Sequence, residues 1–383
     1  MNYYSCQNRS LFFIFRLLHH LESLSIYMAL FNDIINLGHE GVYLCSDPET
    51  GLKAIIAIHN TVLGPALGGT RMWHYEEEEE AMTDVLRLSR GMTYKASISG
   101  LQLGGGKAVI IGEASRLKNQ KLMRRFGQFV NDLAGKYITA EDVNMSEQDM
   151  VWISQETKHV TGLPISMGGN GDPSPVTAYT TYLGMKAAVK VAYGNDTLQN
   201  KKVLVQGLGN VGTYLIEQLS KEGAKVLVSD IFESKIDAIT SKFDVEVIHA
   251  NDVMSTQVDV YAPCALGATV NSESLKTLNC AVIAGAANNQ LAIEDEDGLL
   301  CMKKGIIHAP DFLINSGGLI NVCAEYYGRS KQDAMSDADY VYNKTIEILT
   351  ESADTGVPPQ IVATAHAEAR IKEAKQTQHS LVR

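Results

Sequence analysis

The sequence is short of the features that membrane proteins and nucleic-acid-binding proteins need. None of its apolar runs reaches the roughly 18 residues of a membrane-spanning helix. Its 33 basic residues are outnumbered by 44 acidic ones, which leaves a formal net charge of -11. An acidic surface repels phosphate backbones and anionic lipid. We therefore expect neither nucleic acid nor a membrane as a partner.

Cysteine is scarce as well, and no two cysteines have the C-x-x-C spacing of a zinc knuckle or a dithiol redox motif. The sequence therefore predicts no metal site. Scattered cysteines are typical of free, buried thiols in a reducing compartment, so we expect a cytoplasmic protein. The six cysteines are Cys6, Cys45, Cys264, Cys280, Cys301 and Cys323.

The first 27 residues differ from the rest of the chain. Residues 11–18 are apolar, but Arg16 interrupts them, the run is too short to cross a bilayer, and no small-x-small cleavage site follows. A more ordinary globular sequence begins at Met28. We interpret residues 1–27 as an upstream extension, and a short targeting or packing segment is the open alternative.

The length predicts two domains, because 383 residues exceed the roughly 250–300 at which a single hydrophobic core stops growing. We place a first α/β domain at residues 28–165 and a second at 166–329. The division falls in the glycine- and proline-rich segment 162–175. The last stretch, 330–383, is charged and helical without a strand, and we expect it to join the first domain.

Hydrophobic periodicity predicts the elements of the first domain. Residues 52–59 are rich in β-branched side chains and predict a strand. The acidic run 76–80 starts a helix whose apolar stripe is Ala81, Val85, Leu88 and Met92. The other elements are a glycine turn at 104–106 that leads into a strand ending at 111, a helix at 120–133 and a strand at 137–140.

The second half alternates strands with helices, after a long connecting helix at 176–193. This alternation predicts a parallel, doubly wound sheet of the Rossmann type. The expected strands are 202–206, 225–230, 245–249, 258–261, 281–284 and 306–308.

A glycine-rich turn follows the first of these strands. Its residues are Gly207, Leu208, Gly209, Asn210, Val211 and Gly212, and a helix opens at Val211. The G-x-G-x-x-G pattern between a strand and a helix is typical of dinucleotide binding, because the glycines let the backbone approach a pyrophosphate at the helix N-terminus.

Asp230 ends the next strand, near the expected distance of about 20 residues. Its carboxylate would accept hydrogen bonds from ribose hydroxyls and repel a 2′-phosphate, which favours NAD over NADP. The alternative is a glycine turn in a cofactor-free domain, with Asp230 as a loop residue.

Two lysines and an aspartate are candidates for catalysis. Lys107 stands between three glycines and an apolar strand, so burial would lower the pKa of its ammonium, and a nearby Lys95 would lower that pKa further. A lysine of this kind can act as a general base. Asp142 follows a strand, where α/β sheets place their chemistry. The alternatives are ordinary solvated lysines and a helix N-cap at Asp142.

Seven motifs in the chain resemble those of the glutamate/leucine/phenylalanine/valine dehydrogenase superfamily, in the order found in that family. The resemblance runs from about residue 30 to the end and is nearest to the leucine-acting members. The motifs are Leu63–Arg71 (LGPALGGTR), Gly91–Lys95 (GMTYK), Leu103–Lys107 (LGGGK), Thr139–Val143 (TAEDV), Pro173–Ala178 (PSPVTA), Ala262–Ala268 (APCALGA) and Ala287–Leu291 (ANNQL).

The resemblance implies a role for each matching residue. Lys107 is the implied catalytic lysine, Asp142 the aspartate that handles protons on the amino group, and Lys95 the ligand of the substrate carboxylate. Implied neighbours of the substrate are Gly68, Gly69, Leu67, Ala140, Leu319 and Val322. The cofactor set adds Thr177, Ala265 and Asn288 to the glycine turn and Asp230.

The resemblance also implies the reaction and the assembly. It implies reversible, NAD-dependent oxidative deamination of a branched-chain L-amino acid, leucine preferred over valine and isoleucine, to the 2-oxo acid and ammonia. The protein would be a homo-oligomer, from a dimer to an octamer.

The chain departs from the family at two positions. The leucine enzymes usually have valine where Leu319 stands, and the family commonly has glycine where Asn144 stands. The side-chain set Leu67, Ala140, Leu319 and Val322 is apolar, which argues against glutamate as substrate. A bulkier Leu319 makes the pocket shallower, and Asn144 alters the loop beside Asp142.

Three other functions are compatible with parts of the pattern. A phenylalanine or valine dehydrogenase of the same superfamily shares the motifs. A non-catalytic NAD-binding regulatory protein would keep the fold, but the intact catalytic residues argue against it. A hydroxy-acid dehydrogenase would need a histidine base, whereas His59 and His308 lie in strand-like segments and are interpreted as structural.

Overall fold

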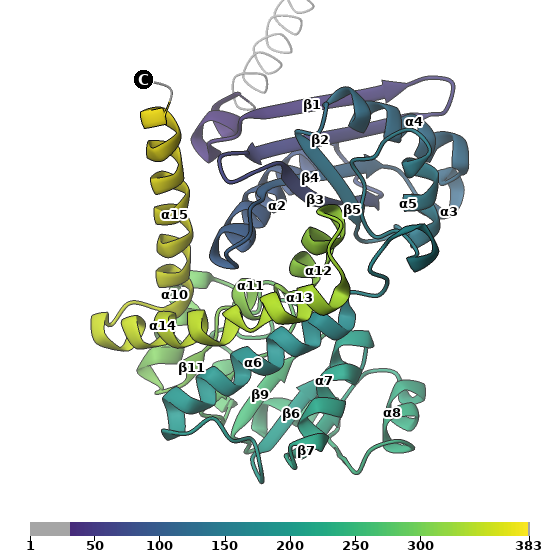
Figure 1. Ribbon diagram of the computed structural model, residues 1–383. Coiled ribbons are helices and arrows are strands. Elements are labelled where there is room, and N and C mark those ends of the chain that lie inside the picture. Colours follow the sequence, from purple (N-terminus) through teal and green to yellow (C-terminus); the bar gives the residue numbers. More distant parts are fainter. Residues whose placement is uncertain (1–30, 382–383) are drawn as a thin grey trace, which may run out of the picture.

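A computed structural model describes residues 31–381 as two α/β halves, each built around its own sheet, joined by the long helix α6 (Ser174–Tyr193) (Figure 1). The expected extension 1–27 and Cys6 lie outside the described residues. No helix within the described part of the chain combines the length and hydropathy that crossing a membrane requires.

The sheet of the first half is mixed. β1 and β2 are antiparallel, β2 and β4 are antiparallel, and β3 runs parallel to β4 on one side and to β5 on the other. The strand order is β1-β2-β4-β3-β5. The strands are β1 (Gly41–Asp47), β2 (Leu52–Asn60), β3 (Ala66–Trp73), β4 (Gly104–Ile111) and β5 (Tyr137–Glu141).

Helices cover both faces of this sheet. Alternate residues of β2 point to opposite sides, as the period of a strand requires. Ile55 and Ala57 pack with α2 (Glu78–Ile98), and Ile56 packs with α4 (Gln120–Asp132). The helix α5 (Glu147–Ser154) lies against α4. The first half is therefore a three-layer structure with β3 and β4 near its centre.

The structure corrects the expected glycine turn at 104–106, which belongs to the strand β4. The glycines are needed there because neighbouring backbone lies unusually close. A Cβ at Gly104 would stand 1.9 Å from the Asn60 carbonyl oxygen, and one at Gly105 would stand 2.1 Å from the Thr93 nitrogen of α2.

The same close approach changes the buried face of α2. Ala81 and Val85 are buried as expected, but Leu88 and Met92 are only half-buried. Ser89 and Thr93 take the fully buried positions instead. Small polar side chains fit where the helix backbone nearly touches β4, and their hydroxyls bond within the helix or to neighbouring histidines.

The second half has an all-parallel sheet of order β11-β10-β9-β6-β7-β8. The order reverses between β6 and β9, and such a switch point opens a crevice at the carboxyl ends of the strands. The strands are β6 (Lys202–Gln206), β7 (Lys225–Ser229), β8 (Glu246–Val247), β9 (Val260–Pro263), β10 (Val282–Ile283) and β11 (Ile307–His308). The doubly wound prediction is confirmed, with the outer strands shorter than expected.

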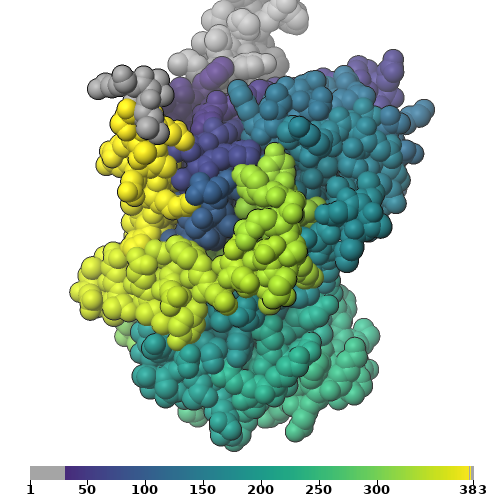
Figure 2. Space-filling model, viewed as in Figure 1, coloured from purple at the N-terminus to yellow at the C-terminus, as the bar shows by residue number. Residues whose placement is uncertain are grey.

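The C-terminal helices divide between the two halves (Figures 1 and 2). α13 (Lys331–Ala338) and α14 (Tyr340–Thr355) pack against α6, whereas α15 (Pro359–Leu381) lies along α2. Arg370 of α15 donates hydrogen bonds to the carbonyl oxygens of Ser97 at 2.9 Å and Gly100 at 3.1 Å. The end of the chain thus returns to the first half, while α13 and α14 stay on the second.

One carboxylate organises the segment between the two halves. Glu325, in α12 (Gly317–Tyr326), accepts backbone N–H bonds from Gly162 at 2.8 Å, Leu163 at 3.1 Å and Asn170 at 3.1 Å. A glycine-rich segment would otherwise have many conformations. These bonds hold the connection in one shape.

Candidate active site

Two glycines of β3 allow the flanking strands to bring their side chains together. Lys107 lies in β4 and Asp142 directly follows β5, on opposite sides of β3. A Cβ at Gly68 would stand 1.7 Å from the Gly106 oxygen, and one at Gly69 would stand 2.9 Å from the Asp142 Cβ. A larger residue at Gly68 would displace the backbone of β4, and one at Gly69 would displace Asp142.

Lys107 and Asp142 form a short ion pair, with 2.6 Å between Nζ and Oδ2. Lys107 is buried, with 6% of its surface exposed. Burial lowers the pKa of Lys107, although the charge of Asp142 opposes that shift. Burial alone would raise the pKa of Asp142, but its contacts with Lys107 and Arg71 outweigh burial and lower it. The carboxylate is therefore ionised beside an amine that gives up its proton more readily than usual.

Arg71 is a part of the site that sequence reasoning did not single out. Its Nε donates to the same Oδ2 of Asp142 at 3.1 Å, and its Nη1 contacts Asp84 at 2.9 Å. Asp84 also accepts the Tyr75 hydroxyl at 2.7 Å. The available signal was a charged residue inside the otherwise uncharged β3. The arginine contacts the same carboxylate oxygen as Lys107 and helps to keep Asp142 charged.

Lys95, from the last turn of α2, reaches across to the second half. Its Nζ donates to Asn315 Oδ1 at 2.7 Å and lies 3.5 Å from Asn288 Oδ1. Burial lowers the pKa of Lys95 to about 8, which the charge of Asp311 counteracts and that of Lys107 reinforces. Asn315 was not predicted, because it is 220 residues away from Lys95 in the sequence and the two meet only in the folded protein.

Asn288 connects this lysine to the second sheet. It follows β10 and accepts a hydrogen bond from Asn315 Nδ2 at 2.8 Å. Thr177, in the first turns of α6, is half-buried, and its hydroxyl donates to the Pro173 oxygen at 3.2 Å. Their expected position beside a nicotinamide stays a prediction.

The expected side-chain pocket residues are largely buried. Leu67 and Leu319 belong to one hydrophobic cluster that spans both halves, and the half-buried Val322 packs against it. Ala140 is buried in β5, where it pairs with Gly69 of β3. Leu67 and Ala140 thus lie beside the glycine pair in the first sheet, whereas Leu319 and Val322 come from α12.

The glycine-rich turn has the geometry of a pyrophosphate site. Gly207 has a φ of +109°, and a Cβ there would stand 2.7 Å from the Ala265 Cβ. At Gly212 a Cβ would stand 2.1 Å from the Gly207 oxygen, so the helix α7 (Asn210–Lys221) could not pack against the turn. Around Gly209 there is open space, at the N-terminus of α7. Room for a phosphate and free helix N–H groups coincide there.

Asp230 is tied to that turn and is not a mere loop residue. Its Oδ2 accepts the Leu208 N–H at 2.7 Å and its Oδ1 accepts the Phe232 N–H at 2.9 Å. Burial would raise the pKa of Asp230, but these bonds outweigh it and lower the pKa. Lys235 Nζ also lies 3.8 Å from Oδ2, and 6% of the Asp230 side chain is exposed, so the carboxylate is held in place beside the turn.

The alternative role of Asp142 as a helix N-cap is wrong. Ser146 caps α5 and forms a reciprocal capping box with Asp149. Asn144, between them, has a φ of 59° and donates its side-chain amide to the Met72 oxygen at 3.0 Å. Asparagine tolerates this left-handed conformation better than most residues, so it can replace glycine there. The loop beside Asp142 is thereby anchored to β3.

The two histidines considered for a hydroxy-acid mechanism lie elsewhere. His59 is buried, with its Nδ1 2.7 Å from Thr93 Oγ1, and His308 lies 3.3 Å from Gln290 Oε1. Burial lowers the pKa of each to about 4. Within residues 31–381, no group of three or more histidine, cysteine or acidic side chains is placed to hold a metal ion. The described cysteines, Cys45, Cys264, Cys280, Cys301 and Cys323, are free thiols.

A doubly wound sheet with a dinucleotide turn, facing a second sheet that carries a buried lysine–aspartate pair, defines a two-domain dehydrogenase with a nicotinamide cofactor. Residues 39–159 match the Glu/Leu/Phe/Val dehydrogenase dimerisation domain, and residues 168–232 and 228–378 match the Glutamate/Leucine/Phenylalanine/Valine dehydrogenase domain. The chain belongs to this family of amino-acid dehydrogenases, which deaminate amino acids oxidatively.

Similar proteins carry several substrate names. The chain is 46% identical over 355 residues to a leucine dehydrogenase of Thermoactinomyces intermedius, covering 93% of this chain and 97% of the relative. It is 43% identical over 340 residues to a phenylalanine dehydrogenase of Caldalkalibacillus thermarum, covering 88% and 92%. The crystal structure of L-tryptophan dehydrogenase from Nostoc punctiforme superposes with a TM-score of 0.81 at 41% identity, covering 90% of this chain and 99% of that one.

Proposed function

We propose that this protein is an NAD-dependent dehydrogenase that converts a branched-chain L-amino acid, preferably leucine, to its 2-oxo acid and ammonia. Valine and isoleucine would also be substrates, and the reaction would be reversible. The observation that carries the proposal is the buried Lys107–Asp142 ion pair, with Lys95 nearby. The expected side-chain pocket residues Leu67 and Leu319 are buried in one hydrophobic cluster to which both halves contribute.

Each charged group has a task in this reaction. The nicotinamide, when bound, supplies the acceptor for the hydride that leaves the substrate Cα. Lys95 binds the substrate carboxylate as a point charge and orients Cα. Lys107, once neutral, takes a proton from the water that adds to the iminium carbon. Asp142 passes protons to the amino group, so that ammonia departs and the 2-oxo acid remains.

A panel of L-amino acids with NAD tests this function. We expect NADH formation with leucine, less with valine and isoleucine, and very little with glutamate, whose charge would be buried without a partner. Each methylene is worth only about 1–3 kcal/mol, so activity on several apolar amino acids is expected. Higher kcat/KM for phenylalanine or tryptophan would overturn the leucine preference. Absence of turnover with every apolar amino acid would overturn the function.

We further propose NAD rather than NADP, because Asp230 stands where a 2′-phosphate would meet a second negative charge. In Asp230→Asn, the dissociation constant for NAD should rise roughly 10- to 150-fold, since a hydrogen bond to a charged group is worth about 1.5–3 kcal/mol. Binding measured by fluorescence titration should show this rise and a smaller preference over NADP. The control is Asp237→Asn, at an exposed position of α8 (Glu233–Thr240). Unchanged NAD affinity in Asp230→Asn would contradict the assignment.

The two lysines predict opposite limbs of the pH profile. Lys107 must be neutral to act as a base, so kcat should fall as the pH drops below its lowered pKa. Lys95 must be charged to hold the carboxylate, so substrate affinity of the free enzyme should fall as the pH rises through about 8. The inhibitor 4-methylpentanoate isolates the second effect, because it lacks the amino group that also titrates.

The inhibition constant of 4-methylpentanoate should rise above pH 8 or so in the wild-type protein, where Lys95 loses its charge. In Lys95→Arg the inhibition constant should not change with pH, because the guanidinium remains charged. An inhibition constant independent of pH in the wild type would remove Lys95 from carboxylate binding.

We also propose a homo-oligomer, between a dimer and an octamer. We propose the domain division 28–165 and 166–329, with the correction that only α15 of the C-terminal helices joins the first domain, because α13 and α14 pack against α6. Support for association comes from the matched dimerisation domain and from β1, an edge strand whose Leu44 is 71% exposed. An unpaired edge with apolar side chains is a surface that proteins usually cover.

A further inference from the structure

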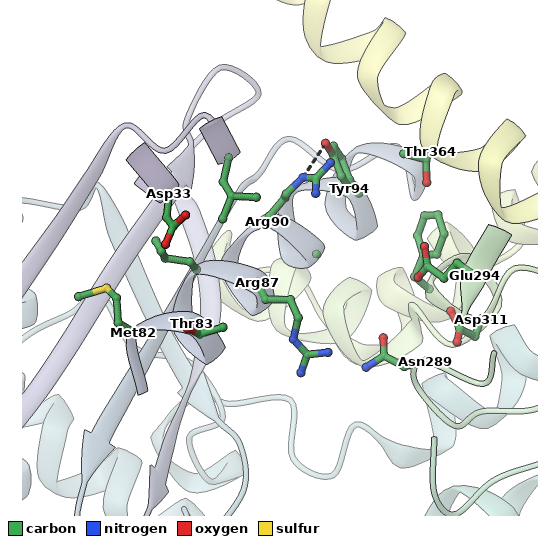
Figure 3. Close-up of a pocket in the computed structure, with 14 residues that line it drawn as sticks. Asp33, Met82, Thr83, Arg87, Arg90, Tyr94, Asn289, Glu294, Asp311 and Thr364 are labelled. Atoms are coloured by element: carbon green, nitrogen blue, oxygen red, sulfur yellow. Dashed lines mark hydrogen bonds between the residues drawn. The ribbon is translucent and has the colours of Figure 1, made fainter. Parts of the chain in front are cut away.

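A cavity of about 520 Å³ lies between α2, α15, the segment that precedes β1, and the start of α10 (Glu294–Lys303) and of α11 (Asp311–Ile314) in the second half (Figure 3). Its α2 wall consists of residues spaced by three or four positions, which is one face of a helix: Thr83, Arg87, Arg90 and Tyr94. Lys95 comes one residue later and is therefore turned by about 100° around the helix axis from Tyr94. The cavity and the proposed substrate-binding residue Lys95 thus occupy different faces of α2.

Charges of both signs line this cavity, and Figure 3 places a third carboxylate, Asp33, on the other side of Arg90 from Glu294. Figure 3 shows Arg87 and Arg90 on the α2 side, with Glu294 and Asp311 across from them. Arg90 donates through Nε to the Tyr94 hydroxyl at 3.1 Å and forms no ion pair with an acidic side chain among residues 31–381. Its remaining N–H groups are free to bind an anion.

The acidic wall is short of positive charge. Burial raises the pKa of Glu294, and nearby Asp311 raises it further, while Arg90 opposes only weakly. Burial also raises the pKa of Asp311, despite a backbone hydrogen bond from Gln290 and the charge of Lys95. A cation placed between two such carboxylates would stabilise their charged forms.

Apolar side chains complete the lining. Leu37, Met82, Leu86 and Phe312 all face the cavity. Its volume falls in the range of about 300–1,000 Å³ that is typical of small-molecule sites. A ligand that satisfies all three surfaces needs an anionic group, a cationic group and an apolar body.

We propose that this cavity binds a second α-amino acid with an apolar side chain, as a zwitterion. Its carboxylate would pair with Arg90, beside Arg87, which also contacts Asp84 at 3.4 Å, and its ammonium would pair with Glu294 and Asp311. Arginine suits the first task because its planar fork matches a carboxylate. This site is apart from the catalytic one, and the inference rests on the proposed function only for the kind of amino acid.

A ligand in the cavity would change the electrostatic environment of Lys95. Asp311 lines the cavity and also favours the charged form of Lys95. Asn289 lines the cavity too and directly follows Asn288, which lies 3.5 Å from the Lys95 amine. An ammonium beside Asp311 would compete for that carboxylate and weaken the hold of Lys95 on the substrate. Excess amino acid would then raise KM.

Equilibrium dialysis of the full-length protein with radiolabelled L-leucine and no NAD tests the proposal, because no turnover can occur. The wild type should bind a second molecule per chain. Arg90→Gln and Glu294→Gln should each bind one molecule fewer, and Arg90→Lys should recover part of the loss. Lys95→Gln should lose the other molecule. The control is Arg116→Gln, at an arginine whose side chain is 80% exposed.

The outcomes separate the two proposals. A single bound molecule that Lys95→Gln removes and Arg90→Gln leaves would overturn the cavity site and keep the catalytic one. Binding that Arg90→Gln removes and Lys95→Gln leaves would keep the cavity and overturn the catalytic assignment. NAD binding and thermal unfolding of each variant, compared with the wild type, show whether the fold is intact. Two molecules in every variant would overturn the cavity site.

Discussion

Replacing Lys107 by alanine is expected to lower kcat for amino-acid oxidation by about 10²–10⁴-fold, the range that a positioned general base contributes. The amine is buried and stands 2.6 Å from Asp142, so water cannot easily take its place with the same orientation. Steady-state kinetics with leucine measure the loss. NAD affinity should be unchanged, because the glycine-rich turn lies in the other half.

Two further variants make this result specific. Lys276→Ala removes a lysine whose side chain is 67% exposed, and its activity should match the wild type. Lys107→Arg keeps the positive charge but cannot give up its proton, so it should stay inactive. Wild-type kcat in Lys107→Ala would take the base role away from this residue. Recovery of activity in Lys107→Arg would show that charge alone is needed.

Asp142→Asn is expected to lower kcat by a similar factor, about 10²–10⁴-fold, because an amide has the same shape but cannot accept and release a proton near neutral pH. It should also change the pH profile. In the wild type the carboxylate opposes the loss of the Lys107 proton. Without that charge the pKa of Lys107 falls further, so the acidic limb of kcat should move to lower pH.

The combined readout distinguishes a chemical role from a structural one. Loss of this charge would move the acidic limb whether or not Asp142 transfers protons, so the role in proton transfer is read from kcat measured above that limb, and thermal unfolding shows whether the fold is intact. Asp354→Asn, at an exposed position of α14, is the matched control and should behave as the wild type. A kcat above that limb within a few-fold of wild type would exclude Asp142 from proton transfer.

Local patterns were sufficient for much of this fold. β2, α4, β5 and the turn between β6 and α7 follow from periodicity and glycine placement, because their hydrogen bonds are made within a few residues or along one strand. The doubly wound sheet follows from alternation of strands and helices. The prediction of a turn at 104–106 was wrong, because a run of glycines looks the same in the sequence whether it forms a turn or part of a strand.

The wrong apolar stripe in α2 has the same origin. Leu88 and Met92 are the larger side chains, and hydrophobicity alone favours burying them. Ser89 and Thr93 are buried instead, because Gly105 of β4 lets the helix backbone come too close for a large residue. Only the tertiary packing reveals that distance.

The sequence by itself determined the kind of cofactor turn, the division of the chain into two domains and the candidate residues Lys95, Lys107 and Asp142. Those features depend on residue type and on short spacing along the chain, and both can be read directly from the sequence. Tertiary structure alone decided which groups act on them: Arg71 on Asp142, Asn315 on Lys95, and the charged cavity between α2 and the second half. Electrostatic interactions act through space, and residues far apart in the chain become neighbours only when the two halves fold together.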